Sequence, residues 1–244
     1  MDRRVKEAIK VLKAPGVLTE EAKRELLELL VFPPERRKMT YEEFLDWADE
    51  DTLAEWVDGE VVIYSPASKR HQEIAGFLYR LLSDYVELKE LGSVFQSPFQ
   101  MKLERSGREP DLLFVAKENL HRLKPTYLDG PADLVVEIVS PESVVRDKGE
   151  KFYEYQEASI PEYWLIDPDQ ERAEFYRLGE DGLYRVAFAG REGGFRSEVL
   201  SGFWLRVEWL WQESLPPVED VMLEIGGEEY ARRLVERLKQ RGFL

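Results

Sequence analysis

A long amphipathic helix is the feature of the sequence that most restricts the fold. Apolar residues recur at three- and four-residue steps from a start near Ser68, and Gly92 is placed to end the helix. A helix with one apolar face must bury that face against another layer of structure. The chain therefore needs a sheet or further helices beside this segment. The apolar face consists of His71, Ile74, Ala75, Leu78, Leu81, Leu82, Tyr85 and Leu88.

Two local signals precede this helix. Thr40 and Glu43 have the spacing of a capping box, which predicts a short helix over residues 41–49. Asp58-Gly59 is a strong signal for a two-residue turn, and it predicts a β-hairpin over residues 53–64.

Short apolar segments that are typical of β-strands follow the helix. Pro98 interrupts or edges the first of them. A helix over residues 143–157 separates the later segments. This order predicts an α/β (α+β) fold in which helices flank a mixed central sheet. The predicted strands are residues 94–103, 112–115, 133–139, 163–166, 174–178 and 183–188, with 199–207 as a less regular candidate.

The sequence predicts a core domain with helical additions at both ends. We expect residues 1–37 to form a helical appendage, residues 38–215 the core domain, and residues 216–244 a helical tail with a charged helix over about 228–241. The appendage has an apolar stripe that must pack on the core or on a second subunit. That stripe contains Leu26, Leu29 and Leu30.

Composition excludes several classes of protein. The absence of cysteine excludes disulfides and thiolate catalysis. No apolar run approaches the roughly 18 residues that a membrane span needs, and the N-terminus does not resemble a signal peptide, so we expect a cytoplasmic protein with no membrane partner. The formal net charge of −15 disfavours a non-specific nucleic-acid binder, so binding of DNA must depend on local positive charge.

Glu137 is an acidic residue inside an otherwise apolar strand, residues 133–139. Because side chains alternate between the faces of a strand, Val135, Glu137 and Val139 share one side. Burying a carboxylate there is costly unless another group compensates its charge. Glu137 is therefore either a member of a buried ion pair or an edge residue open to water, or else a metal ligand or general acid–base group.

Asp111 is a second acid at the start of an apolar strand. It follows Pro110 and precedes residues 112–115. A single Pro-Asp pair is a weak signal, but two acids on successive strands are more informative. If the two strands are neighbours, Asp111 and Glu137 can converge on Mg²⁺ or Mn²⁺, which prefer oxygen ligands.

A basic segment follows the strand of Glu137. Lys151 and Tyr155 are four residues apart and share a helix face, with Lys148 nearly on the same face one turn earlier. A lysine there can orient water or neutralise charge on a phosphate. The alternative is a solvated charge run with local ion pairs.

Two more residues are weaker candidates for the site. His71 lies on the apolar face of the long helix, where a histidine is more often a satisfied core residue than a ligand. Glu55, in the first strand of the predicted hairpin, is a further acid near the site.

Taken in order, these residues resemble the Uma2 family of restriction-type endonucleases, long catalogued only as a domain of unknown function, within the PD-(D/E)XK nuclease superfamily. The resemblance covers about residues 38–180 and does not include the N-terminal appendage. The matching residues are Glu55, Asp58-Gly59-Glu60, His71, Pro110-Asp111, Glu137-x-x-Ser140-Pro141, Arg146-Asp147, Lys151, Tyr155 and Pro161-Glu162-Tyr163-Trp164-Leu165-Ile166-Asp167-Pro168.

The resemblance implies a four-stranded mixed sheet with flanking helices and Mg²⁺-dependent hydrolysis of DNA phosphodiester bonds. Asp111 and Glu137 would hold the metal. The sequence departs from the superfamily pattern at Val139, where a lysine is expected two residues after the second acid. Lys151 is then the displaced lysine, with Lys148 as the fallback.

Two hypotheses follow. The first is an endonuclease that binds DNA through a local basic rim despite the global charge, because salt screens distant charges beyond about 8–10 Å. A homo-oligomer, with a C₂ dimer as the commonest form, would suit double-strand cutting. The alternative is a catalytically inactive nuclease-like protein that acts as an interaction or assembly module. The rim would comprise Lys69, Arg70, Arg146, Lys148 and Lys151, with Lys102, Arg105 and Arg108 on the approach to Asp111.

Overall fold

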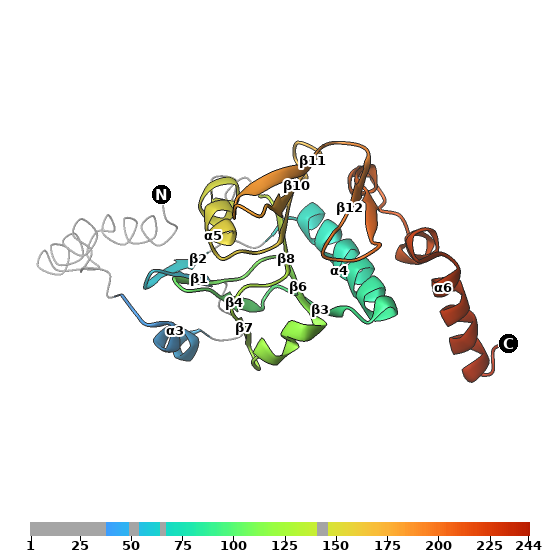
Figure 1. Cartoon of the computed structure of the whole chain (residues 1–244), viewed down its shortest axis with the longest axis horizontal. Coiled ribbons are helices and arrows are strands. Elements are labelled where there is room, and N and C mark those ends of the chain that lie inside the picture. The colour runs from blue at the N-terminus through green and yellow to red at the C-terminus, as the bar shows by residue number, and fades with distance from the viewer. Residues whose placement is uncertain (1–37, 49–53, 64–66, 141–145) are drawn as a thin grey trace, which may run out of the picture.

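A six-stranded mixed sheet lies at the centre of the computed structural model, which describes residues 38–48, 54–63, 67–140 and 146–244 (Figure 1). The strand order is β11-β10-β9-β8-β6-β3, and only β8 and β9 pair in parallel. The mixed sheet and flanking helices confirm the predicted fold class. The sheet has two strands more than the four of the family pattern, because the β10–β11 hairpin, predicted as further strands over 174–178 and 183–188, extends it at one edge. The strands are β3 (Gly92–Gln96), β6 (Leu112–Ala116), β8 (Leu134–Ile138), β9 (Glu162–Asp167), β10 (Arg172–Leu178) and β11 (Tyr184–Gly190).

A second, five-stranded sheet has the order β2-β1-β5-β4-β7. The predicted hairpin is confirmed: Val57 pairs with Glu60, and Asp58 and Gly59 both have positive φ angles, of 50° and 90°. The strand predicted over 94–103 is interrupted at Pro98 as expected, and the two parts, β3 and β4, belong to different sheets. The five strands are β1 (Ala54–Val57), β2 (Glu60–Ile63), β4 (Gln100–Lys102), β5 (Ser106–Arg108) and β7 (Tyr127–Asp129).

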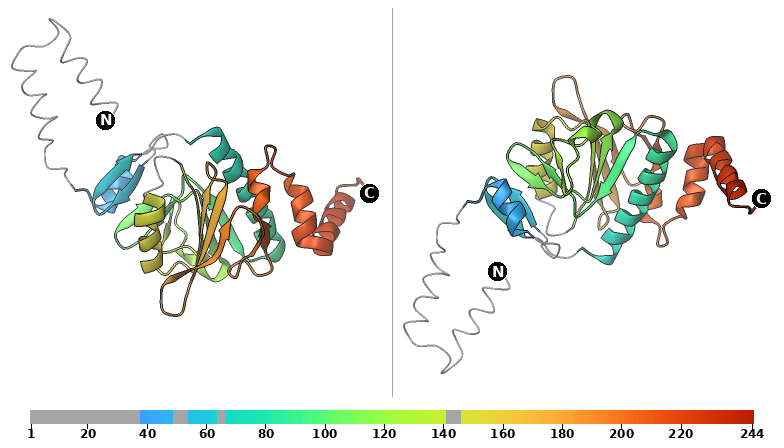
Figure 2. Two further views of the ribbon diagram at one scale, coloured as in Figure 1. Left: turned by 90° about the horizontal axis from the view of Figure 1, so that it is seen from above. Right: turned by 90° about the horizontal axis from the view of Figure 1, so that it is seen from below.

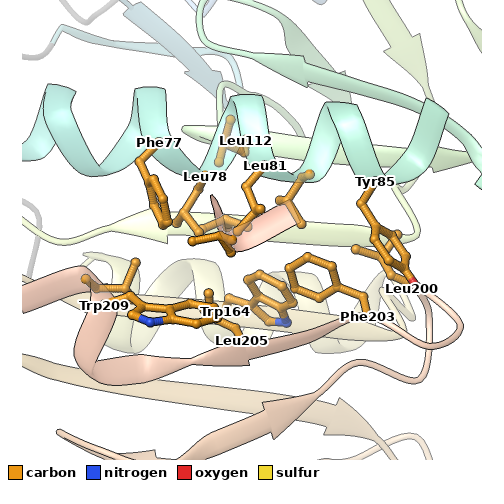
Figure 3. Packing of buried hydrophobic residues seen from close by; sticks show 14 of the residues in the cluster. Phe77, Leu78, Leu81, Tyr85, Leu112, Trp164, Leu200, Phe203, Leu205 and Trp209 are labelled. Atoms are coloured by element: carbon orange, nitrogen blue, oxygen red, sulfur yellow. The ribbon is translucent and has the colours of Figure 1, made fainter. Parts of the chain in front are cut away.

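The long amphipathic helix is α4 (Lys69–Lys89), and Ser68 caps its N-terminus by accepting a hydrogen bond from the backbone of His71. It ends three residues before Gly92. Glu90 takes the left-handed conformation that stops the helix, with a φ of 53°, and Gly92 begins β3 instead. The buried face of α4 packs over aromatic residues of the sheet and of the C-terminal strands (Figure 3). The labelled members of this cluster include Phe77, Leu81, Tyr85, Trp164, Phe203, Leu205 and Trp209.

The central sheet has a different core on each face. Leu134, Val136 and Ile138 of β8 pack in the cluster under α4. Val135 and Val139 pack in a second cluster with Tyr155 of α5 (Lys151–Glu157), so α4 and α5 cover opposite faces (Figure 2). This alternation confirms the predicted strand periodicity. It also places Glu137 on the face covered by α5.

The first and last helices of the described chain differ in how closely they match their predicted bounds. Helix α3 (Tyr41–Trp47) has the predicted capping box between Thr40 and Glu43. Helix α6 (Val218–Gln240) starts ten residues before the predicted segment. Gly227, with a φ of 54°, kinks α6 and interrupts the sequence pattern, so only the part after the kink was predicted.

The remaining elements are short. The strand expected over 199–207 is only β13 (Trp204–Arg206), paired with β12 (Gly194–Arg196). Within the helix predicted over 143–157, a π-helical turn (Arg146–Glu150) precedes α5. Two 3₁₀ helices span Lys117–Arg122 and Val207–Trp211.

Residues 1–37, including the predicted leucine stripe, lie outside the described residues. In the part of the chain that the structure describes, no helix is long and apolar enough to cross a membrane.

Candidate active site

Asp111 and Glu137 lie on neighbouring strands. Leu112 of β6 pairs with Val136 of β8 in an antiparallel register, so the next position along places Asp111 opposite Glu137. The backbone N–H of Ile138 donates a 2.6 Å hydrogen bond to Oδ2 of Asp111, which holds this carboxylate against the end of β8. The structure therefore brings together the two acids that the strand pattern singled out.

Glu137 is buried, with only 3% of its surface exposed, and two side chains donate hydrogen bonds to its carboxylate. Its Oε1 atom accepts hydrogen bonds from Lys151 Nζ at 2.9 Å and from the Tyr155 hydroxyl at 2.7 Å. Both donors come from successive turns of α5, the helix that covers this face of the sheet. Within the described ranges, the second oxygen of Glu137 accepts no hydrogen bond.

Lys151 lies among three carboxylates. Besides Glu137, its Nζ atom is 3.1 Å from Oε1 of Glu55 and 3.6 Å from Oδ1 of Asp147. Val139, where the superfamily pattern expects a lysine, is instead buried in the core under α5. The ammonium of Lys151 thus reaches the second acid from a helix rather than from the strand itself.

His71 contacts the first acid. Its Nε2 atom lies 3.2 Å from Oδ1 of Asp111, and the side chain is buried on the first turn of α4. Burial would lower the pKa of His71, but the hydrogen bond and the charge of Asp111 outweigh it and raise this pKa. His71 is buried on the apolar face as expected, but it is not a fully satisfied core residue, because its Nδ1 atom has no hydrogen-bond partner among the described residues.

Lys148 does not contact Glu137. Its ammonium lies 3.3 Å from Oδ2 of Asp167, at the end of β9. The fallback lysine is therefore bound to a different carboxylate, and Lys151 is the lysine that contacts the second acid.

Arg108 was misplaced by the sequence reasoning. It was expected on an open basic rim, but it is 1% exposed and paired with Glu55, Glu150 and Glu154. The sequence holds one signal for this burial. Glu150 and Glu154 are four residues apart, so on a helix they lie on the same face and can bind one shared cation. Asp147 was likewise missed as a neighbour of Lys151.

The rest of the expected basic rim is mostly engaged locally. Lys69 is largely exposed and pairs with Glu73. Arg70 donates to the backbone carbonyls of Leu210 and Gln212. Arg105 pairs with Asp58 of the hairpin turn, and Lys102 lies over the ring of Tyr41. The side chain of Arg146 lies outside the described part of the chain.

The electrostatics of the site show an excess of negative charge. Burial and the nearby carboxylates of Asp147, Asp111 and Glu55 raise the pKa of Glu137, although Lys151 opposes the shift. The pKa of Lys151 is also raised, because its three carboxylate neighbours outweigh the effect of burial. Lys151 therefore carries a full positive charge, and that charge does not suffice to neutralise the acids around it.

A divalent cation fits this donor set. Within the described residues, no group of three carboxylate or imidazole side chains is arranged to hold a metal unaided. Mg²⁺ commonly uses only one or two protein carboxylates and completes its shell with water and substrate phosphate. Asp111 and Glu137 supply two such carboxylates at adjoining positions of neighbouring strands. Burial and then the nearby carboxylates raise the pKa of Glu137, and a bound cation would offset both effects.

Comparisons with known proteins agree with the fold and with the family resemblance. A model of the Uma2 family, described as "Putative restriction endonuclease", matches residues 41–208. The structure is also similar to the crystal structure of a putative nuclease belonging to DUF820 from Anabaena variabilis ATCC 29413, with a TM-score of 0.62 and 17% sequence identity. That similarity covers 71% of this chain and 97% of the other. A search of curated proteins found no match.

Proposed function

Because the chain belongs to the Uma2 family of putative restriction endonucleases, we propose that it is a metal-dependent endonuclease that hydrolyses DNA phosphodiester bonds at Asp111 and Glu137. One observation carries the proposal: Lys151 lies 2.9 Å from Glu137, so a charged lysine is present although the motif position is Val139. The two acids and a lysine together make up the set of groups that this chemistry needs.

Asp111 and Glu137 are the residues that would hold the metal. A divalent ion held by these residues would polarise a phosphate oxygen as a Lewis acid and activate a water nucleophile. The hydrogen bond from Ile138 N–H fixes Asp111, and both hydrogen bonds from α5 to Glu137 go to its Oε1 atom.

Lys151 acts as a fixed positive charge rather than as a base. A general base must give up its own proton before it can accept one, and the raised pKa of Lys151 keeps it protonated. A preorganised ammonium beside the scissile phosphate stabilises the negative charge that develops on the phosphate oxygens in the transition state. Its hydrogen bond to Glu137 also holds that carboxylate in place.

Tyr155 and His71 orient the two acids. The Tyr155 hydroxyl donates a hydrogen bond to Oε1 of Glu137, and His71 Nε2 contacts Oδ1 of Asp111. Each acid is therefore held by a side chain from a different helix, α5 for Glu137 and α4 for Asp111. Such supporting contacts fix the geometry of ligands and catalytic groups.

A cleavage assay tests the proposal. The purified protein is incubated with plasmid and with single-stranded DNA in Mg²⁺ or Mn²⁺, beside an Asp111→Ala/Glu137→Ala double variant and with a chelator. The matched control is Asp181→Ala/Glu219→Ala, which removes two exposed carboxylates from surface ion pairs. We expect the wild-type and control proteins to cut, and the double variant and the chelated samples not to cut.

Two other outcomes would contradict the proposal. Equal cutting by the Asp111→Ala/Glu137→Ala variant would indicate a contaminant or a different site. No cutting of either DNA by the wild-type protein would favour the alternative, a non-catalytic protein on a nuclease-like scaffold, because a fold alone does not establish an activity.

A further inference from the structure

A buried arginine outside the two acids and the lysine organises the helix that carries Lys151. Arg108 ends β5, and Trp56 of β1 pairs with Gly107, so the next position along places Glu55 opposite Arg108. Arg108 Nη1 lies 3.2 Å from Oε2 of Glu55. An arginine this deeply buried is rare unless its charge is fully paired.

The other nitrogens of Arg108 bind α5 and the turn before it. Nη2 donates to Glu150 at 2.6 Å, and Nε donates to Glu154 at 2.7 Å. These glutamates lie one residue before and three residues after Lys151, so the guanidinium binds the chain on both sides of the lysine. A planar guanidinium can bind several carboxylates at fixed angles, which an ammonium cannot do.

Glu55 contacts both Arg108 and the ammonium of Lys151. Oε2 of Glu55 binds Arg108. Oε1 of Glu55 lies 3.1 Å from Lys151 Nζ in an ion pair, and it accepts a 3.1 Å hydrogen bond from the backbone N–H of Glu109. One carboxylate therefore fixes the position of both cations. Lys151 is shared between Glu55 and Glu137. Burial would raise the pKa of Glu55, but the charges of Lys151 and Arg108 outweigh it and lower this pKa.

Stability alone does not account for this network. Buried ion pairs are often no more stabilising than apolar residues of similar volume, because the cost of desolvating the charges offsets their attraction. The network lies directly behind Lys151, and each of its members contacts either the lysine or the segment that carries it.

We infer that Arg108 and Glu55 are positioning residues, which hold α5 and direct the ammonium of Lys151 onto Glu137. Neither residue needs to touch the substrate in this role. The inference concerns the site of the proposed nuclease function, but the placement of Lys151 can be measured without any cleavage.

The test observes the lysine directly. In protein labelled with ¹⁵N-lysine, a buried and hydrogen-bonded ammonium exchanges its protons slowly and gives its own ¹H–¹⁵N signal, which Lys151→Arg identifies by its loss. We expect Arg108→Lys and Glu55→Gln to shift this signal and to speed its exchange with water. Arg80→Lys, which makes the same change in an exposed ion pair with Glu219, should leave it unchanged.

Several results would overturn the inference. A Lys151 signal that is unchanged in folded Arg108→Lys and Glu55→Gln proteins would do so, as would the absence of a slowly exchanging signal from the wild type. If Arg108→Lys does not fold, Glu154→Gln replaces it, because this variant weakens the contact between Arg108 and residue 154 and retains the arginine. We expect it to shift the signal in the same direction, and no shift would again contradict the role.

Cleavage kinetics supply a second readout. A misplacement of about 1 Å can cost on the order of 10²-fold in rate, so we expect Arg108→Lys to lower kcat by that order with little change in KM. A purely structural role would lower the amount of folded protein and not kcat per folded molecule. If the wild type does not cut DNA, the proposed function fails, while the lysine signal still decides the positioning role.

Discussion

Lys151 Nζ lies 2.9 Å from Oε1 of Glu137, although the two residues are 14 positions apart and belong to a helix and a strand. Val139, two positions after Glu137, has the side chain that the core requires and is packed among apolar neighbours. In the superfamily pattern one strand carries both acid and lysine. Here the strand position is apolar and packs in the core, and the lysine comes from α5. This arrangement makes the lysine depend on how α5 is held.

Replacing Lys151 tests the displaced-lysine assignment. We expect Lys151→Ala to lower metal-dependent cleavage by about 10²–10³-fold, the loss typical of removing one preorganised group that stabilises transition-state charge. Metal binding should be nearly intact, because Asp111 and Glu137 remain. Cleavage rates and a calorimetric titration with Mn²⁺ measure the two effects separately.

The stability of the same variant must be measured beside its activity. Removing one partner from a buried ion cluster costs about 3–5 kcal/mol, so Lys151→Ala should also unfold at a lower temperature. Lys89→Ala, which breaks an ion pair with Glu229 far along α4, is the control and should cut normally. Normal cutting by folded Lys151→Ala would show that the lysine assignment is wrong.

Metal binding predicts a thermal shift. At a concentration of 100 times its dissociation constant, a ligand that binds only the folded state stabilises it by about 2.7 kcal/mol, or roughly 5–10 °C in a chain of this size. We expect Mn²⁺ to raise the unfolding temperature of the wild type and not that of Asp111→Asn/Glu137→Gln. Asp181→Asn/Glu219→Gln should respond like the wild type. An equal shift in all three would place the ion elsewhere.

The pair of acids could be predicted from the sequence because strand periodicity is local. The alternation around Glu137 and the apolar run after Asp111 each involve a few consecutive residues, and the structure follows both patterns. The chain order of the strands also sufficed to predict a mixed sheet with helices on its faces.

The partners of these acids could not be predicted, because they depend on long-range pairing. Arg108 meets Glu55 only because β1 pairs with β5, about fifty residues later in the chain. A three-residue strand such as β5 does not reveal which of its side chains are buried. The π-helical turn before α5 also rotates the following residues in a way that an α-helical pattern does not anticipate.

Tyr155 offers a milder test of how Glu137 is held. Tyr155→Phe removes a 2.7 Å hydrogen bond to a carboxylate and leaves the ring packed against Tyr163. Hydrogen bonds to charged groups contribute about 1.5–3 kcal/mol, so we expect a loss of stability in that range and a fall in kcat. Denaturant unfolding and single-turnover cleavage measure the two effects.

The matched control is Tyr184→Phe. Its hydroxyl donates a 2.9 Å hydrogen bond to the backbone carbonyl of Ile160, outside the site. The loss of a hydrogen bond to a neutral acceptor should cost only about 0.5–1.5 kcal/mol and leave kcat unchanged. Equal kinetic effects of the two variants would argue against a role for Tyr155 in holding Glu137.

Glu162 is the natural comparison for Glu137, because both are buried acids in apolar strands. Glu162 has no lysine partner among the described residues. It accepts hydrogen bonds from the Trp164 indole and from the backbone N–H groups of Glu198 and Val199, which tie β9 to the following loop. The same sequence pattern therefore ties a strand and a loop together at Glu162, whereas at Glu137 it places an acid beside Lys151 in the proposed site.

Exchanging each acid for its amide separates these roles. Glu137→Gln should abolish metal-dependent cleavage, whereas Glu162→Gln should lower stability by about 1–3 kcal/mol and leave kcat per folded molecule unchanged.

Burial raises the pKa of Glu162, and its hydrogen bonds offset only part of the shift. The folded state then binds more protons than the unfolded state as the pH rises above 4.5, so wild-type stability falls over that range and the amide variant lacks this slope. Urea unfolding of both proteins between pH 4 and pH 8 measures the difference, and a difference that does not change with pH would contradict the raised pKa of Glu162.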